Sequence, residues 1–563
     1  MVRQIIRTLA SPVRGLHEAA YVLAAFALLS QVLALVRDRL LAGTFGAHET
    51  LDLYYAAFRI PDFLFATVAS LLSLYALMPV LSRLEAEHPG RMIGFLRQML
   101  LVFFVGMALV ALVCFLLAPE LVRLIAPGYA ADPAAAGQLV MLTRILLLQP
   151  IFLGASNILA NLTQMRHRFV LYSISPLLYN LGIIAGVVFF YPVFGIGGLG
   201  WGVVLGAIMH FLVQVPYFAR EAASERVPWK ESMRHLREVL VLSVPRTFAL
   251  ASTQISLLAL TALASYLAAG SIAVFMFAYN LQAVPIAIIG VSYSLAAFPT
   301  LARLHAQGKS GELARHVETA LRHLLFWSIP ATVLAIVLRA QLVRVILGAG
   351  AFDWSATRLT AAALALFILS LAAQNVTLLI ARTYYAAGNS RKPLYYGLVD
   401  IAVSIGSAVG LVALFHASPA LRLFMESLLR VDNTAGTTVL MLALGYALGS
   451  IAEAVVGYAY FIRDFGIETA RLGRLAFTSF CASVMGGAGA YAVLELLGIY
   501  LPYSTTLGVF LHGLTAGIAG ISITACVLSL MGSEELSEAY AALRRRLRPS
   551  AAVALEPTDI ESS

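Results

Sequence analysis

Six charged residues stand inside the first two apolar runs of this chain, where a charge is costly and therefore marks a candidate for function. They are Arg37, Asp38, Arg39, Asp52, Arg59 and Asp62. If the second run is a helix, Asp52 and Arg59 lie two turns apart on one face, with Asp62 three residues further on. The three side chains could then line one wall of a cavity, as the polar groups of substrate and ion pathways do.

A second interpretation of these charges needs no ligand. Arg37 and Arg39 would sit at the outer membrane interface with their side chains reaching toward lipid headgroups, and Asp62 would only neutralise Arg59. Against it, the rest of the chain keeps that outer side nearly free of positive charge. Both interpretations stay open at the level of the sequence.

Three charged residues in later apolar runs are further candidates. Arg246 follows Pro245 early in the seventh run, where a kink could turn it toward a cavity, although a cytoplasmic anchor fits equally well. Asp400 and Glu453 lie in the eleventh and twelfth runs. For these two carboxylates, a structural pairing and a role in transport are both consistent with the sequence.

The composition predicts the elements that must position these residues. Hydrophobic residues make up 60% of the chain and charged residues 12%, with a mean hydropathy of +0.87, against roughly 25% charged residues in an ordinary soluble domain. Apolar runs long enough to cross a hydrocarbon core recur along the chain. We predict an all-α polytopic membrane protein with about fourteen spans, at 18–42, 51–81, 95–118, 137–163, 169–191, 196–218, 238–268, 271–301, 317–342, 357–381, 394–416, 436–462, 474–497 and 505–530.

The chain contains two related halves. Residues 79–86 recur as 299–306 with Pro, Leu, Arg, Leu and Ala in matching positions, and residues 121–125 recur as 342–346. Matches in the same order indicate an internal duplication, and parallel repeats around a central site are typical of secondary transporters. We predict two six-helix lobes at 18–236 and 237–465, followed by two further helices at 466–531. The two ends, 1–17 and 532–563, would be cytoplasmic.

Lys and Arg concentrate in alternate connections between the predicted spans. The connections at 43–50, 191–199 and 498–504 contain none, whereas the connection at 220–237 holds five. The positive-inside rule therefore predicts a multi-pass protein of the cytoplasmic membrane with both termini in the cytoplasm. In this setting the net charge of +9 does not indicate a nucleic-acid partner.

The sequence argues against an enzyme. No connection is long enough for a soluble catalytic domain, and the phosphate-loop, zinc-peptidase and hydrolase motifs are missing. The cysteines are too scattered to bind a metal: Cys114, Cys481 and Cys526. We therefore expect no catalytic residues, no metal site and no cofactor, apart from a coupling cation or the membrane potential.

Several segments, in order, carry a family resemblance. The opening segments are 31–38 (QVLALVRD), 45–47 (FGA) and 51–61 (LDLYYAAFRIP). The later segments are 126–129 (APGY), 252–256 (STQIS), 350–352 (GAF) and 385–393 (YAAGNSRKP). Together they resemble the MurJ/MviN proteins, the lipid II flippases of the MOP exporter superfamily, over about residues 18–530.

The resemblance implies two six-helix lobes around a V-shaped central cavity, with two C-terminal helices forming a groove for a lipid tail. It also implies that basic cavity residues hold the pyrophosphate of the substrate, for which arginine is well suited. By position, Arg37, Asp38, Asp52 and Arg59 carry over from the family pattern.

The chain departs from the family pattern at several cavity positions. Gln31, Phe65-Ala66 and Tyr279-Asn280 stand where the family typically has arginines or an Asp-Arg pair. Arg39 and Arg246 are not recognised family positions and would be the residues that compensate, with Arg246 replacing the cation missing at Asn280.

From these observations we predict a flippase that moves a polyprenyl-pyrophosphate-linked saccharide, lipid II by resemblance, across the membrane by alternating access. Its partners would be this substrate, membrane lipids and proteins of envelope synthesis. The alternatives are a MATE-like, cation-coupled antiporter of small molecules, which needs only about twelve spans and a protonatable carboxylate, and a non-transporting scaffold for envelope synthesis. An intramembrane enzyme should show a cluster of His, Asp and Glu, which the sequence lacks.

Overall fold

The computed structural model describes residues 16–72, 74–87, 89–220, 227–466, 469–500 and 505–547, all as helices and short connections. Most of the predicted N-terminal segment 1–17 and the end of the predicted tail, 548–563, lie outside the described residues. The side chain of Arg246 also lies outside them, although its backbone belongs to a described helix.

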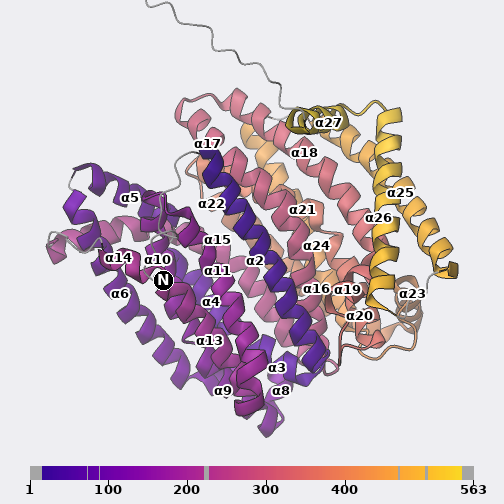
Figure 1. Cartoon of the computed structure of the whole chain (residues 1–563), viewed down its shortest axis with the longest axis horizontal. Helices are drawn as coiled ribbons and strands as arrows, with labels where there is room; N and C mark the ends of the chain where they lie inside the picture. The colour runs from indigo at the N-terminus through magenta and orange to yellow at the C-terminus, as the bar shows by residue number, and fades with distance from the viewer. Residues whose placement is uncertain are drawn as a thin grey trace, which may run out of the picture.

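The first half of the chain forms a lobe of long and short helices on the left of Figure 1. Its elements are α2 (Leu16–Phe45), α3 (Glu49–Ala57), α4 (Arg59–Thr67), the 3₁₀ turn η1 (Ala69–Leu72), α5 (Leu74–Glu87), α6 (Pro89–Leu116), α7 (Ala118–Ile125), α8 (Pro127–Ala130), α9 (Pro133–Leu146), α10 (Gln149–Met165), α11 (Phe169–Ala185), the π-helical turn η2 (Gly186–Phe190), α12 (Tyr191–Phe194), α13 (Ile196–Leu212) and α14 (Val215–Arg220).

The second half forms a lobe on the right of Figure 1. Its elements are α15 (Trp229–Ala264), α16 (Ser271–Pro285), the π-helical turn η3 (Ile286–Val291), α17 (Ser292–Ala306), α18 (Ser310–Val337), α19 (Arg339–Leu347), α20 (Trp354–Ile368), α21 (Leu371–Ala386), α22 (Arg391–Ala417), α23 (Pro419–Leu429) and α24 (Val439–Phe465). Three more helices follow: α25 (Thr469–Tyr500), α26 (Thr506–Leu530) and α27 (Glu534–Leu547).

Ten helical segments among the described residues are long and apolar enough to cross a membrane, or eleven if α20 and α21, bent by 46° at their junction, count as one span. Each coincides with one of the fourteen predicted spans. The other three predicted spans fall on α2, on α15 and on the series from α3 to α5, which is broken at Phe58 and Val68. The all-helical, polytopic class predicted from composition is confirmed.

The outward faces of the helices suit a lipid environment. On α6, the side chains of Leu101, Val105, Leu109 and Leu112 are all more than half exposed and follow helical spacing. Such a continuous apolar stripe is stable in hydrocarbon but not in water.

Within each lobe, small residues allow two neighbouring helices to pack closely. In the first lobe, a Cβ on Gly182 would stand 2.2 Å from the Cα of Gly206, so α11 and α13 touch backbone to backbone. In the second lobe, a Cβ on Gly445 would stand 2.8 Å from Ala408, where α24 meets α22. Close backbone approach through small residues is the usual way in which membrane helices associate.

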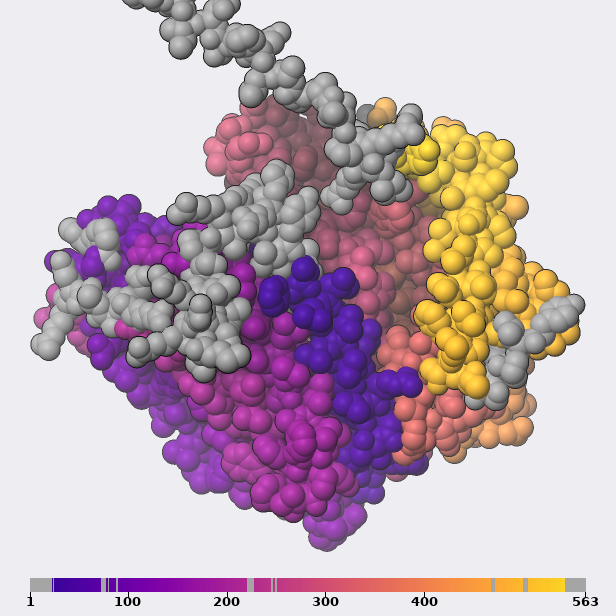
Figure 2. Space-filling model, viewed as in Figure 1, coloured from indigo at the N-terminus to yellow at the C-terminus, as the bar shows by residue number. Residues whose placement is uncertain are grey.

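One helix links the two lobes, and two helices flank the second. α2 runs diagonally across the front of Figure 1 and contacts both α11 of the first lobe and α19 of the second. α25 and α26 pack on α18 and α19 and form the flank of the second lobe that faces away from the first, drawn in yellow in Figure 2.

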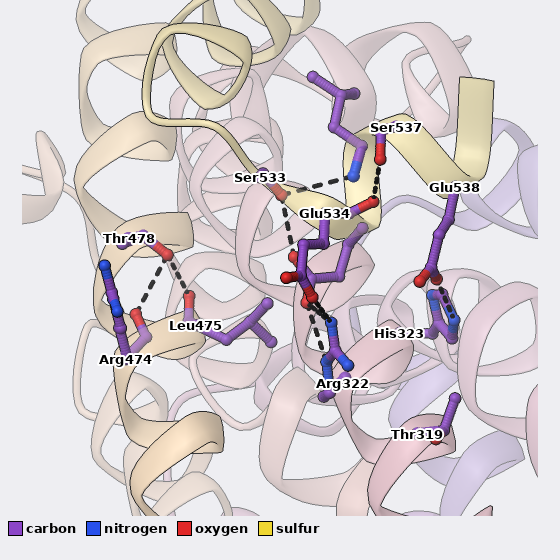
Figure 3. A network of polar contacts seen from close by, with 12 residues as sticks. Thr319, Arg322, His323, Arg474, Leu475, Thr478, Ser533, Glu534, Ser537 and Glu538 are labelled. Carbon is purple, nitrogen blue, oxygen red and sulfur yellow. Dashed lines mark hydrogen bonds and ion pairs between the residues drawn. The ribbon is translucent and has the colours of Figure 1, made fainter. Parts of the chain in front are cut away.

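The final helix, α27, is bound to the first half of α18 by polar contacts. Arg322 Nη2 donates to Glu535 Oε1 at 2.5 Å and to Glu534 Oε2 at 3.1 Å. His323 Nε2 lies 3.3 Å from Glu538 Oε2, and Figure 3 shows Arg322 facing Glu534 and His323 facing Glu538. The C-terminal helix therefore lies against the same end of the second lobe at which α18 begins.

Candidate functional site between the two lobes

Arg37 and Asp38 form a polar cluster that reaches both lobes. Arg37 donates from Nε to Asp38 Oδ1 at 2.9 Å and from Nη1 to Asn180 Oδ1, on α11, at 3.0 Å. Asn280 Nδ2, on α16 of the second lobe, donates to Asp38 Oδ2 at 3.3 Å. Three of the eight predicted site residues, Arg37, Asp38 and Asn280, thus lie together.

The Arg37 guanidinium is held in place, but some of its N–H groups have no hydrogen-bond acceptor among its partners Asp38 and Asn180. Its side chain remains 20% exposed, whereas that of Asp38 is 6% exposed. A guanidinium has five N–H groups, and only part of them is used by Asp38 and Asn180. The group can therefore donate to a further oxygen ligand while Asp38 keeps its orientation.

Arg59 and Asp62 form a second, looser pair on α4. Arg59 Nη2 lies 3.8 Å from Asp62 Oδ2, and Arg59 Nε donates to the carbonyl of Tyr55 at 3.4 Å. The Arg59 side chain is 4% exposed and that of Asp62 31% exposed. Because charge-assisted hydrogen bonds are usually 2.7–2.9 Å long, the Arg59 guanidinium is less committed to its carboxylate than Arg37 is.

Asp52 does not join this cluster but caps a helix of the opposite lobe. Its carboxylate accepts hydrogen bonds from the backbone N–H groups of Gly270 and Ala273 at 2.6 and 2.7 Å and from Tyr129 Oη at 2.5 Å. These donors include the N-terminus of α16, where a carboxylate satisfies otherwise unpaired N–H groups. Asp52 is therefore directed across the lobe junction, and not onto a wall shared with Arg59 and Asp62.

Arg39 is also a contact between lobes. It donates from Nη1 to the carbonyl of Val345 at 2.5 Å and from Nη2 to that of Gly348 at 3.4 Å, at the C-terminus of α19. A cation at this helix end satisfies carbonyls that have no partner within the helix. Arg39 thus neither reaches toward headgroups nor faces Arg37.

Backbone contacts reinforce this junction. The N–H of Ala351 donates to the carbonyl of Gly43 at 2.8 Å. A Cβ on Gly270, which has a φ of +90°, would stand 1.9 Å from the carbonyl oxygen of Ala47, so only glycine fits there. We call the contacts of Arg39, Gly43 and Asp52 with the second lobe the closed seam; it lies at the end of the molecule opposite α27 (Figure 1).

The second lobe has a buried carboxylate of its own. Asp400 on α22 accepts hydrogen bonds from Ser256 Oγ on α15 at 2.8 Å and from Ser404 Oγ at 3.1 Å. A structural partner for Asp400 is therefore present. Glu453 lies half-buried on α24, and the described residues contain no group of three or more His, Cys, Asp or Glu side chains arranged to hold a metal ion.

Sequence reasoning missed two partners of the predicted residues. Asn180 lies within the predicted fifth span, so the cost of a buried polar group would have marked it as a candidate. Tyr129 belongs to the segment 126–129 that carries the family resemblance, yet nothing in its spacing links it to Asp52.

Two helical lobes with a buried charged cluster at their junction, closed at one end by a seam, define a membrane transporter rather than an enzyme. The family model described as "Lipid II flippase MurJ" matches residues 41–511. The chain therefore belongs to the MurJ lipid II flippase family, as the resemblance predicted. The match begins after Arg37, Asp38 and Arg39, so the binding role of these three residues stays a prediction.

Relatives and solved structures agree with this assignment. The chain is 27% identical over 412 residues to the lipid II flippase MurJ of Burkholderia cenocepacia, which covers 72% of this chain and 80% of that protein. It is 25% identical over 388 residues to the probable lipid II flippase MurJ of Thermotoga maritima, which covers 67% and 75% respectively.

The fold is shared with two kinds of transporter. A structure of lipid II flippase MurJ in an inward closed conformation matches with a TM-score of 0.69 at 18% identity, covering 91% of this chain and 99% of that one. An inward-facing multidrug resistance MATE family transporter of the MOP superfamily matches with a TM-score of 0.62 at 15% identity, covering 80% and 96%. The predicted MurJ- and MATE-like fold is confirmed.

Proposed function

We propose that this protein moves a polyprenyl-pyrophosphate-linked saccharide, lipid II by family, across the cytoplasmic membrane by alternating access of its two lobes. The observation that carries the proposal is the Arg37–Asp38 cluster at the lobe junction, in a chain of the MurJ family. Burying such charges has no purpose in a scaffold, whereas a transporter of a charged headgroup needs them.

The Arg37–Asp38 and Arg59–Asp62 pairs would bind a pyrophosphate in different ways. Arg37 would keep Asp38 and Asn180 as partners and give its remaining N–H groups to the headgroup. Arg59 would exchange its distant partner, Asp62 at 3.8 Å, for a phosphate oxygen. Both arginines would then hold the ligand through charge-assisted hydrogen bonds, which are roughly twice as strong as neutral ones.

The closed seam gives the proposed direction of entry. The charge pattern of the connections predicts that the end bearing α27 is cytoplasmic, which would make the seam the outer gate. The headgroup would enter from the cytoplasm while Asp52 and Arg39 hold the outer ends of the lobes together. Release would require the Asp52 carboxylate to leave the N-terminus of α16.

An apolar groove supports a lipid-linked substrate. A cavity of about 350 Å³ lies between α18, α21, α24 and the start of α25, with walls that include Leu325, Val376, Val455 and Leu472. Its lining is almost entirely apolar, as a polyprenyl chain requires. The tail would stay in this groove or in lipid while the saccharide crosses between the lobes, driven by a cation or by the membrane potential, which supplies about 2.3 kcal/mol per charge at 100 mV.

Depletion of the protein tests this proposal and separates it from its alternatives. We expect the polyprenyl-pyrophosphate saccharide to accumulate in the cytoplasmic leaflet, measured by its accessibility to a membrane-impermeant enzyme that cleaves the headgroup. An antiporter of the MATE kind would instead change the efflux of small cations and leave the lipid where it is. A scaffold would be recognised by a transport-dead Arg37→Ala variant that still supports envelope synthesis.

A further inference from the structure

An arginine-lined cavity lies outside the lobe junction. It has a volume of about 610 Å³ and is bounded by α19, α20, α23 and the adjoining ends of α25 and α26. These elements meet at the lower right of Figure 1, at the end of the molecule opposite α27. Its arginines are Arg339, Arg358 and Arg430. We call this cavity the arginine pocket.

The three guanidinium groups of the arginine pocket are bonded only to neutral acceptors. Arg358 donates from Nε and Nη2 to the carbonyl of Arg430 at 2.9 and 2.6 Å. Arg430 donates from Nη2 to Tyr491 Oη at 2.6 Å. Arg339 donates to two backbone carbonyls, at 3.0 and 3.4 Å. Over the part of the chain that the structure describes, no carboxylate lies within 4.0 Å of these groups.

This arrangement differs from that of Arg37 and Arg59 at the lobe junction, each of which faces an aspartate. The carboxylate of Glu495 also lines the cavity, but one negative charge offsets three positive ones only in part, so the arginines repel one another unless a further anion is present. The bonds to carbonyls and to Tyr491 fix the guanidinium planes but use only part of their five N–H groups each. The remaining donors match phosphate oxygens, which arginine binds through two parallel hydrogen bonds.

Apart from Gln341, Tyr491 and Glu495, the rest of the lining fits a hydrocarbon chain. Ile336, Leu428, Leu494 and Val509 contribute apolar side chains, and Trp354 lies beside them. Aromatic residues of this kind are typical of the headgroup level of a membrane. Basic residues are rare at this end of the predicted spans, so orientation in the membrane does not explain three arginines here.

The geometry points to a binding site for the phosphate of an anionic membrane lipid in the leaflet opposite α27, with the lipid chain lying along α25 and α26. The phosphate has two sources: a glycerophospholipid of that leaflet, or the carried polyprenyl pyrophosphate after it has crossed. The site does not rest on the proposed function, because none of its arginines belongs to the lobe junction.

The test uses the purified full chain in a neutral detergent, titrated by calorimetry with three probes: short-chain phosphatidylglycerol, phosphatidylcholine with the same chains, and farnesyl pyrophosphate. We expect phosphatidylglycerol to bind at least about tenfold more tightly than phosphatidylcholine, and the Arg339→Gln/Arg430→Gln double variant to lose about tenfold in affinity for it. Arg339→Lys should lose less, because it keeps the charge but not the planar fork.

Arg123→Gln is the matched control, since it removes a 67% exposed arginine on α7 at the same end of the molecule. A loss for phosphatidylglycerol alone identifies the leaflet phospholipid as the occupant, and a loss for both anionic probes identifies a shared phosphate site. A loss for farnesyl pyrophosphate alone, measured in an Arg37→Ala background, identifies a site for the released product. The inference is overturned if the folded double variant binds both probes as wild type does, or if Arg123→Gln loses as much affinity.

Discussion

The lobes are joined differently at their two ends. At the closed seam the contacts are buried: Asp52 is 1% exposed and accepts three hydrogen bonds from α16 and Tyr129. At the end bearing α27, α5 meets α15 through Arg83 and Glu238, 2.7 Å apart but with side chains 47% and 43% exposed. A surface ion pair contributes little to stability. Breaking a buried polar contact costs more free energy, because it leaves the buried groups without hydrogen-bond partners.

This difference shows where energy must be supplied during transport. Separating exposed charges returns them to water, so that end can open at small cost. Opening the seam removes a carboxylate from two backbone N–H groups and a guanidinium from helix carbonyls. The seam is therefore the gate whose release should limit the cycle, and four changes test this comparison.

The largest effect is expected for Asp52→Asn. The amide keeps the shape of the carboxylate but turns an N–H₂ group toward donors, leaving buried N–H groups of α16 unsatisfied at a cost of about 1–3 kcal/mol each. Spin labels at His48 and Ala269, both exposed beside the seam, should report longer distances between the lobes as a loss of dipolar broadening in continuous-wave electron paramagnetic resonance. Glu49→Gln, an exposed carboxylate on the same helix, is the control. An unchanged distance distribution in Asp52→Asn would show that the seam is not held by this residue.

A smaller effect is expected for Arg39→Gln. The variant loses the charge that complements the C-terminus of α19, an interaction of about 0.3–1 kcal/mol at an exposed helix end and up to about 2 kcal/mol when partly buried. The same spin-label pair should show a partial shift toward the open seam. If Arg39→Gln instead altered binding of a phosphate-bearing lipid without moving the seam, Arg39 would regain the cavity role predicted from the sequence.

At the opposite end, Glu535 tests whether partial burial strengthens a charge pair. Burial alone would raise the pKa of Glu535, but hydrogen bonds from Arg322 and Ser533 outweigh it and hold the pKa below its ordinary value. Its contribution to docking of α27 is thus present above about pH 4.3, the unfolded value, and is lost as the pH falls through the lower folded value.

We therefore expect docking of α27 to be unaffected by mild acidification and to weaken only below about pH 4. Glu535→Gln should weaken it at neutral pH, measured by the mobility of a spin label at Tyr540→Cys. Glu534→Gln is the control, because that carboxylate is 79% exposed. Equal effects of the two substitutions would mean that burial of Glu535 adds nothing.

The smallest effect is expected for Arg83→Gln. Its exposed pair with Glu238 is screened by salt, so the melting temperature should shift slightly at low ionic strength and not at high ionic strength. The seam distances should not change. A shift comparable to that of Asp52→Asn would contradict the comparison of the two ends.

The sequence predicted the fold more fully than the site. Hydropathy was sufficient to predict an all-helical polytopic protein, because each span long enough to cross a membrane is an apolar run in the sequence. The rule of costly intramembrane charge found Arg37 and Arg59, but it could not reveal that Asn180 of α11 is a partner of Arg37. Helical spacing grouped Asp52 with Arg59 and could not reveal that the N-terminus of α16 approaches Asp52 from the other lobe. The carbonyls that bind Arg39 have no signature in side-chain sequence at all.

The central claim, that Arg37 and Arg59 hold a pyrophosphate at the lobe junction, is tested most directly by titrating folded protein with a polyprenyl-pyrophosphate saccharide in nanodiscs. We predict that Arg37→Ala and Arg59→Ala each weaken binding by about tenfold or more, as loss of a charged hydrogen bond implies, with abundance and melting temperature preserved. Arg123→Ala, which removes an exposed arginine, should bind as wild type does. Wild-type affinity in both junction variants would contradict the account, and loss of the protein by degradation would return these arginines to a structural role.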